Sequence, residues 1–117
     1  MRQEFTIQGE LCDLNTYINK ERANRFIGAK IKKEQTEICR WACNNLKPTD
    51  NIHIMFKWYC KNKRKDKDNV AYAKKFAIDG MVKAGIIPND GWNNIKGFTD
   101  EFYIDKENPR IEVIIED

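Results

Sequence analysis

The stretch NIHIMFKWYC, residues 51–60, decides the fold because large apolar side chains recur at every second position. The residues of this set are Ile52, Ile54, Phe56, Trp58 and Cys60. Side chains two apart point to the same face of a β-strand, so this spacing predicts a strand with one buried face. It is the strongest strand pattern in the chain, and a densely basic segment follows it directly.

Three further elements are expected before this strand. The opening EFTIQGEL alternates apolar and polar residues, which predicts a strand ended by Gly9. Asp13 can cap the helix that follows. A second helix is expected between Gly28 and Pro48. Its expected buried stripe consists of Ile31, Ile38, Trp41 and Ala42.

The elements expected after the strand complete a mixed sheet. Asp68 is placed as the N-cap of one helix that runs to a C-terminal cap at Gly85, and a sharp turn follows at residues 88–91. NIKGFTDEFYI and RIEVIIE predict two strands joined as a hairpin by a turn. Residues 1–117 are therefore expected to form a single α+β domain, with a mixed sheet of about four strands packed with two or three helices.

Length and composition fit one domain with one core. The chain has 117 residues, of which 41% are hydrophobic, and this is enough for one modest core. No apolar run approaches the ~20 residues that span a bilayer, and the N-terminus lacks a signal-peptide pattern, so we expect a cytoplasmic protein without membrane contact. The cysteines are expected to be free thiols, because no pair has the two-residue spacing of a zinc site.

Positive charge is concentrated in short segments. The net charge is only +3, but the segment after residue 60 is densely basic, and a second cluster holds Lys30, Lys32 and Lys33. Clustered cations predict contact with phosphate groups. The residues expected to bind DNA are Lys61, Lys63, Arg64, Lys65, Lys67 and Lys74.

Asp66 and Asp68 lie inside the basic segment, where their charge would weaken a simple phosphate-binding surface. Residues two apart in an extended segment point the same way, so both carboxylates could converge on one Mg²⁺ ion. Asp90, in a turn beyond the next helix, is the third expected ligand. In the alternative interpretation, Asp66 pairs with neighbouring lysines, Asp68 only caps a helix and Asp90 is an ordinary turn residue.

A lysine on the following helix is expected to complete the site. Lys75 lies seven residues beyond Asp68, so on a continuous helix it returns to within ~20° of the same face, whereas Lys74 lies ~120° away. The alternative for Lys75 is an ordinary solvated helix lysine. Asp79 lies on a different part of the helix and is expected to be a structural partner.

Taken in order, these residues resemble the RusA family of Holliday-junction resolvases, which are Mg²⁺-dependent endonucleases common in prophages. The resemblance covers most of the chain and is carried by KRKDKDN, residues 63–69, and KKFAIDGMVKAGIIPND, residues 74–90. The tail GFTDEFYIDKENPRIEVII also resembles the prophage branch, in which a strand hairpin closes the domain.

The resemblance implies a site and an assembly. The resemblance implies that Lys75 is the catalytic lysine and that the protein is a homodimer. A homodimer suits a four-way junction, because the junction has approximate two-fold symmetry. The lysine stands about two helical turns beyond the second aspartate, one turn more than in the family, so Lys74 stays an alternative. The residues that correspond to the three metal-binding catalytic aspartates are Asp66, Asp68 and Asp90.

The expected function is therefore a Mg²⁺-dependent, structure-selective DNA endonuclease that resolves Holliday junctions by paired nicking. Mn²⁺ is expected to substitute for Mg²⁺, and no small-molecule cofactor is expected. The alternative, from another functional class, is a catalytically silent DNA-binding protein that assists recombination.

Overall fold

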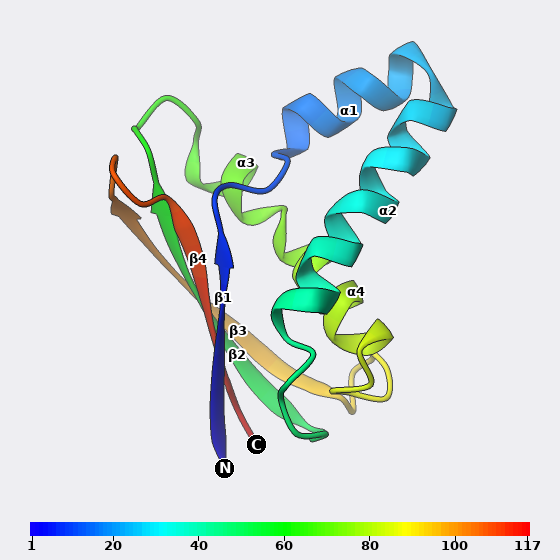
Figure 1. The fold of residues 1–117 in the computed structure, drawn as a ribbon, viewed down its shortest axis with the longest axis vertical. Coiled ribbons are helices and arrows are strands. Elements are labelled where there is room, and N and C mark those ends of the chain that lie inside the picture. Colours follow the sequence, from blue (N-terminus) through cyan, green and yellow to red (C-terminus); the bar gives the residue numbers. More distant parts are fainter.

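The computed structural model describes residues 1–117 as one α+β domain, a four-stranded mixed sheet with helices against one face (Figure 1). The elements in chain order are β1 (Arg2–Gln8), α1 (Leu14–Ala23), α2 (Arg25–Ala42), β2 (Ile52–Cys60), α3 (Lys67–Ala71), α4 (Lys74–Lys83), β3 (Ile95–Ile104) and β4 (Arg110–Glu116). The predicted fold class and the mixed sheet are confirmed.

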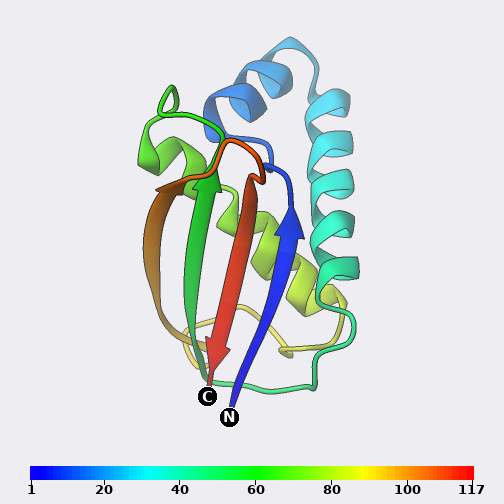
Figure 2. The ribbon, with the colours of Figure 1, turned by 60° about the vertical axis from the view of Figure 1, so that its left-hand side comes forward.

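The strand order is β1-β4-β2-β3. β2 pairs with β3 in parallel and with β4 antiparallel, and β4 also pairs antiparallel with β1. The predicted hairpin of the last two strands is therefore wrong, because β2 lies between them (Figure 2). Alternation and turn residues locate strand ends, but they do not specify which strands are neighbours. β3 consequently forms an exposed edge of the sheet.

The core lies between the sheet and the helices α2 and α4. On β2 the predicted face is confirmed, because Ile52, Ile54, Phe56 and Trp58 are all buried and only Cys60 is half-buried. The sheet is completed on this side by apolar residues of β4 and β1. This packing fixes the C-terminal end of β2, from which the basic loop leaves.

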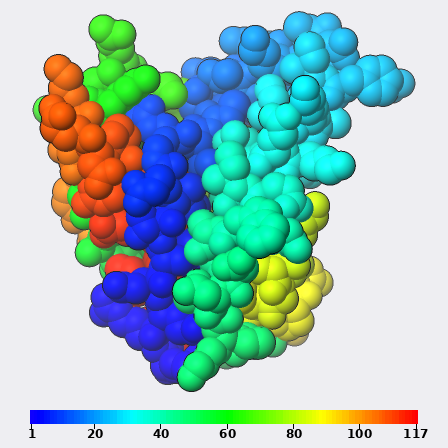
Figure 3. Space-filling view, viewed as in Figure 1, coloured from blue at the N-terminus to red at the C-terminus, as the bar shows by residue number.

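The helices α1 and α2 form a pair, and the end of the pair where α1 leads into α2 projects from the body of the molecule (Figure 3). Asp13 caps α1 as predicted, and Asn24 caps α2, which starts before the expected position. The predicted buried stripe on α2 is wrong at Ile38 and Trp41, whose exposures are 46% and 63%. The buried residues of this helix are instead Gly28, Thr36 and Cys39. The face of α2 that packs against the domain is therefore narrower than the apolar pattern predicted, and it is made of smaller residues.

The crossing of α2 and α4 depends on Gly80. A Cβ atom at this position would lie 2.6 Å from Cβ of Cys39 and 2.7 Å from the backbone N of Arg40. The close approach also encloses the Cys39 thiol, and burial raises its pKa to about 12. All four cysteines are free thiols, and this one is chemically inert at neutral pH.

Gly80→Ala is expected to lower the free energy of unfolding by about 1–3 kcal/mol, because the methyl group must push the two helices apart. The measurement is the urea unfolding midpoint. Gly97→Ala is the matched control, since its new Cβ would have His53 Nδ1 at 3.6 Å as nearest neighbour and should be tolerated. Equal midpoints for the two variants would show that the helix crossing is not as tight as described.

Candidate functional site

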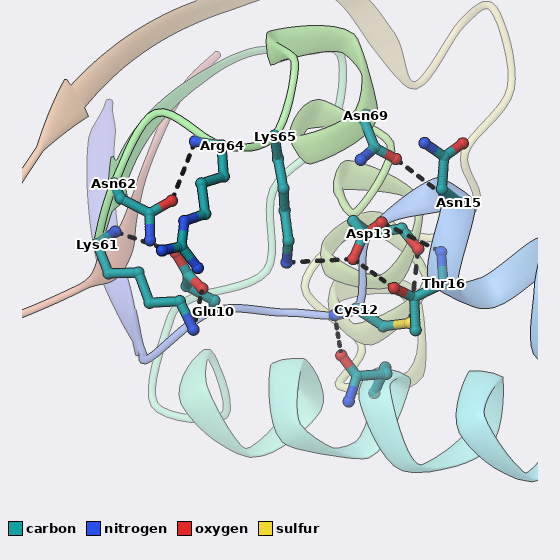
Figure 4. A network of polar contacts seen from close by, with 11 residues as sticks. Glu10, Cys12, Asp13, Asn15, Thr16, Lys61, Asn62, Arg64, Lys65 and Asn69 are labelled. Atoms are coloured by element: carbon teal, nitrogen blue, oxygen red, sulfur yellow. Dashed lines mark hydrogen bonds and ion pairs between the residues drawn. The ribbon is translucent and has the colours of Figure 1, made fainter.

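The basic loop that follows β2 is tied to the segment between β1 and α1 (Figure 4). The Lys65 ammonium lies 3.1 Å from Oδ1 of Asp13. The backbone N–H of Lys61 donates to Oε2 of Glu10 at 3.1 Å, and its ammonium lies 3.8 Å from Oε1 of the same residue. These two predicted DNA-binding lysines therefore form internal ion pairs, while the other cations of the loop have no such partner.

Asp13 is a buried carboxylate with several partners. It is only 5% exposed, and it accepts hydrogen bonds from the backbone N–H and the hydroxyl of Thr16, at 3.1 and 2.8 Å. Burial alone would raise the pKa of Asp13, but the hydrogen bonds from Thr16 and Lys65 outweigh it and hold this pKa well below its usual range. The Asp13 carboxylate thus caps α1 and also holds the basic loop through its ion pair with Lys65.

A second attachment holds the far side of the loop. Oδ1 of Asn69 accepts a hydrogen bond from the backbone N–H of Asn15 at 2.9 Å. Together with the ion pair of Asp13, this bond fixes the chain on both sides of Asp66 and Asp68. The helix cap at Asp13 was predicted from the sequence, but neither attachment was, because the partners lie more than fifty residues apart.

Asp13→Asn is expected to lower the free energy of unfolding by about 1–3 kcal/mol at neutral pH, since the amide keeps the helix cap but loses the charge that pairs with Lys65. Because the pKa of Asp13 is lowered by folding, its contribution is complete above the unfolded value of about 4 and is lost as pH falls toward the folded value. Urea unfolding at several pH values should show the wild-type advantage shrinking below about pH 4. An advantage that stays constant in acid would contradict this role.

Asp66 and Asp68 line two adjoining hollows instead of one. Helix α3 begins at Lys67, so Asp66 takes the N-cap position and Asp68 lies in the first turn, where it accepts the Asn69 N–H at 3.0 Å. The predicted extended segment with a cap at Asp68 is therefore wrong, and residues two apart on a helix do not share a face. Lys67 and Phe102 line both hollows.

The predicted single helix is divided into α3 and α4. Helix α3 ends at Ala71 and α4 begins at Lys74, and the backbone tightens between them, so that the Lys75 N–H bonds to the carbonyl of Tyr72 at 3.1 Å. A bond to the third residue back is the 3₁₀ pattern, which changes the rotation per residue. Lys75 is therefore not placed relative to Asp68 by a continuous helix, and the role of each lysine depends on its own contacts.

Lys74 is half-buried against the sheet. Its ammonium lies 2.6 Å from Oδ2 of Asp100 on β3, and Asp100 also accepts a hydrogen bond from Nε1–H of Trp58 at 2.9 Å. Asp100 was not among the residues predicted for the site. The available signal was a carboxylate between Phe98 and Phe102 on one strand face, a position that requires a polar partner. This contact makes Lys74 part of the structure of the sheet edge.

Lys75 pairs with the predicted ligand Asp90 and with Asp79, which was expected to be a structural partner. Its ammonium lies 3.2 Å from Oδ1 of Asp79 and 3.7 Å from Oδ2 of Asp90. Partial burial opposes the charge, but the hydrogen bond to Asp79 and the charges of both aspartates outweigh it, so the pKa of Lys75 lies above its ordinary value. A lysine held charged in this way suits the stabilisation of phosphate charge and is unsuited to act as a general base.

The three predicted metal-binding aspartates lie in a row of three hollows, of which only the first two share lining residues. Asp66 lines the first, Asp68 the second and Asp90 the third. Lys67 lines the first and second hollows, and Lys75 lines the second and pairs with Asp90 of the third. The third hollow also contains Lys32, Lys33 and Lys83. Both basic clusters of the sequence thus contribute lysines to these hollows.

The donor chemistry of this row suits Mg²⁺, which prefers carboxylate oxygens. The arrangement does not complete a metal site, because no three aspartate, glutamate, histidine or cysteine side chains come close enough together to hold an ion. Asp66, Asp68 and Asp90 are thus present as separate ligands and not as a preformed set.

Comparisons with known proteins give no family assignment. No protein-family model matches the chain, and no curated protein is significantly similar to it. None of the helices combines the length and the apolar character that crossing a bilayer requires. Function therefore has to be argued from the residues and their arrangement.

Proposed function

We propose that the protein is a Mg²⁺-dependent, structure-selective DNA endonuclease that resolves Holliday junctions by paired strand nicking in recombination and repair. The observation that carries the proposal is the row of three hollows, in which Asp66, Asp68 and Asp90 each lie among lysines. Lys67 lines the first two hollows, and Lys75 lines the second and pairs with Asp90 of the third. Such a row can hold a phosphate backbone and offer oxygen ligands to a cation beside it.

Each group in the row has a proposed task. Lys63, Arg64 and Lys67 contact phosphates directly, whereas Lys61 and Lys65 hold the loop in place through their ion pairs. The charge of Lys75 stabilises the negative charge that develops on the phosphate. The proposed ligands of Mg²⁺, or of Mn²⁺ in its place, are Asp66, Asp68 and Asp90. A bound ion would supply an activated water and neutralise charge on the phosphate.

The proposal requires one rearrangement. Asp66, Asp68 and Asp90 must turn from their separate hollows toward a common position, and all three are exposed, so a change of rotamer meets little steric resistance. The backbone of Asp66 and Asp68 is held by Asp13 and Asn69, which favours movement of the side chains alone.

The resemblance to the RusA family supports the proposal through the order of the aspartates and lysines, and it adds the homodimer. Each chain carries one set of these residues, whereas a junction is resolved by two cuts related by a two-fold axis. A dimer places one set at each cut. Light scattering in solution tests this part of the proposal, and a monomeric mass during paired cutting would contradict it.

A second candidate function is a catalytically silent DNA-binding protein that assists recombination. The observation that favours it is the dispersal of the carboxylates, because lysine-lined hollows alone bind DNA. Titration of Mg²⁺ with a labelled four-way junction separates the two. An endonuclease nicks only when the ion is present, and an accessory protein shows salt-sensitive retention without product at any concentration of the ion.

A further inference from the structure

The helices leave one edge of the sheet uncovered. Phe98, Asp100 and Phe102 of β3 lie beside Ile54, Phe56 and Trp58 of β2 in the parallel register, so they belong to the face that the helices cover elsewhere. Figure 2 shows β3 at the edge of the sheet, with α4 behind the central strands. Phe98 is therefore 46% exposed although it occupies an inward position, and Phe102 is half-buried.

Each of these two rings has a lysine ammonium nearby. Nζ of Lys74 lies 5.0 Å from the centre of the Phe98 ring, and Nζ of Lys67 lies 5.7 Å from the centre of the Phe102 ring. Both distances are in the range of cation–π contacts. The rings also pack on their neighbours in β2, with centroids 6.4 Å apart for Phe56 and Phe98 and 6.5 Å apart for Trp58 and Phe102. Phe98 and Phe102 are thus held in place by packing and keep part of their surface open.

Both rings line the hollow of Asp68, which has a volume of about 720 Å³ and is open to solvent. Lys67, Lys74 and Lys75 line the same hollow. A ligand that fits this lining has a flat apolar face for the rings and a negative charge for the ammonium groups. A nucleotide with an unstacked base has both, whereas the bases of an intact duplex stack on each other and present only their edges.

We infer that Phe98 and Phe102 form a stacking site for an unpaired base of a DNA strand, beside the phosphate that Asp68 and Lys75 approach. This inference deepens the proposed function and rests on it for the identity of the substrate. Stacking on an aromatic side chain is tolerant of base identity, because every base has a π-face. Branched DNA opens base pairs at the branch point more readily than a linear duplex, so the site gives selectivity for structure and not for sequence.

The test compares single-stranded with double-stranded DNA in EDTA, so that no cleavage can occur. The probes are fluorescein-labelled dT12 and a 12-bp duplex, and the readout is anisotropy. Phe98→Leu keeps an apolar side chain but removes the π-face, and it should weaken dT12 binding about tenfold or more while duplex binding stays unchanged. Phe98→Tyr should restore dT12 binding. Equal affinity of Phe98→Leu and wild type for dT12, or an equal loss for both probes, would overturn the inference.

The matched control is Phe26→Leu. Phe26 is 72% exposed and has the Arg25 guanidinium 5.2 Å from its ring centre, so it has the same chemistry at the far end of the α1–α2 pair. It should not affect either probe. A second measurement does not depend on a variant: 2-aminopurine within dT12 should lose fluorescence when the wild-type protein stacks on it, and unchanged fluorescence of the bound probe would also overturn the inference.

The outcomes separate this inference from the proposed function. A protein that nicks junctions but shows no difference between Phe98→Leu and wild type has no stacking site and remains an endonuclease. A protein that never nicks but loses dT12 affinity in Phe98→Leu has the stacking site and is not an endonuclease.

Discussion

Asp68→Asn is expected to lower junction nicking by about 10³-fold or more, while junction binding stays intact or becomes tighter. Asp68 is the one predicted ligand that shares a hollow with Lys75, so its carboxylate is placed where the proposed ion and the phosphate must meet. Loss of a ligand removes charge stabilisation worth several kcal/mol, and each 1.4 kcal/mol corresponds to a factor of ten in rate. Binding does not suffer because the substitution also removes a negative charge from a phosphate-binding surface.

The control for this variant is Asp50→Asn. Asp50 precedes β2 and is exposed at the opposite end of that strand from the basic loop, so the substitution makes the same charge change at a residue that lines none of the three hollows. Its amide can still accept the hydrogen bonds that Asp50 accepts from Asn51 and Asn94. Nicking by Asp50→Asn should equal that of wild type. Near-normal nicking by Asp68→Asn at saturating Mg²⁺ would show that Asp68 is not a ligand of the catalytic ion.

Lys75→Ala is expected to lower nicking about 10²-fold with a much smaller effect on binding and little effect on stability. The Lys75 side chain is 48% exposed, and its charge is held by Asp79 and Asp90 in a position that faces the proposed phosphate. Single-turnover nicking rates of the purified variant, together with its urea unfolding midpoint, measure both effects.

Lys74→Ala provides the contrast, because Lys74 is the alternative for the functional lysine. Its loss leaves Asp100 with only the Trp58 N–H as partner, and the free energy of unfolding should fall by about 1–3 kcal/mol. Lys75→Ala should therefore lower the nicking rate, and Lys74→Ala should lower the free energy of unfolding. A larger defect in nicking for Lys74→Ala at unchanged stability would assign the catalytic charge to Lys74 instead.

The strands were predictable because their signal is local. The two-residue period of β2 and the turn residues at strand ends depend only on neighbouring positions, and each strand is found where it was expected. The position of β4 between β1 and β2 depends on packing across the sheet. Its inward residues Ile111, Val113 and Ile115 are almost fully buried, as in a central strand, whereas β3 is exposed. The alternation of apolar residues in β3 and β4 does not show which of the two is the central strand and which is the edge strand.

The helices were also located by their local sequence pattern, but their packing was not predictable from it. The apolar period of α2 located the helix, but Ile38 and Trp41 are exposed, since the contact at Gly80 selects the small residue Cys39 for the interface. A pattern of apolar residues indicates a buried face only where another element covers it. The break after α3 had no marker either, because Tyr72 and Ala73 are compatible with a continuous helix.

For the candidate site, the sequence predicted the residue types better than their geometry. Lys75 and Asp90 were predicted for the same site, and in the structure the two side chains form an ion pair. The convergence of Asp66 and Asp68 assumed an extended backbone that is in fact the start of α3. Asp13 and Asp100 were missed as site partners because their contacts, to Lys65 and Lys74, join segments far apart in the chain.

The most direct test of the central claim is the nicking of a labelled four-way junction and of a linear duplex with the sequence of one pair of arms, each in Mg²⁺ and in excess EDTA. The proposed endonuclease nicks the junction in Mg²⁺ at symmetrically placed strands, nicks the duplex far more slowly, and cuts neither in EDTA. Stable binding of the junction without any product at saturating Mg²⁺ or Mn²⁺ would contradict the account and leave a DNA-binding protein.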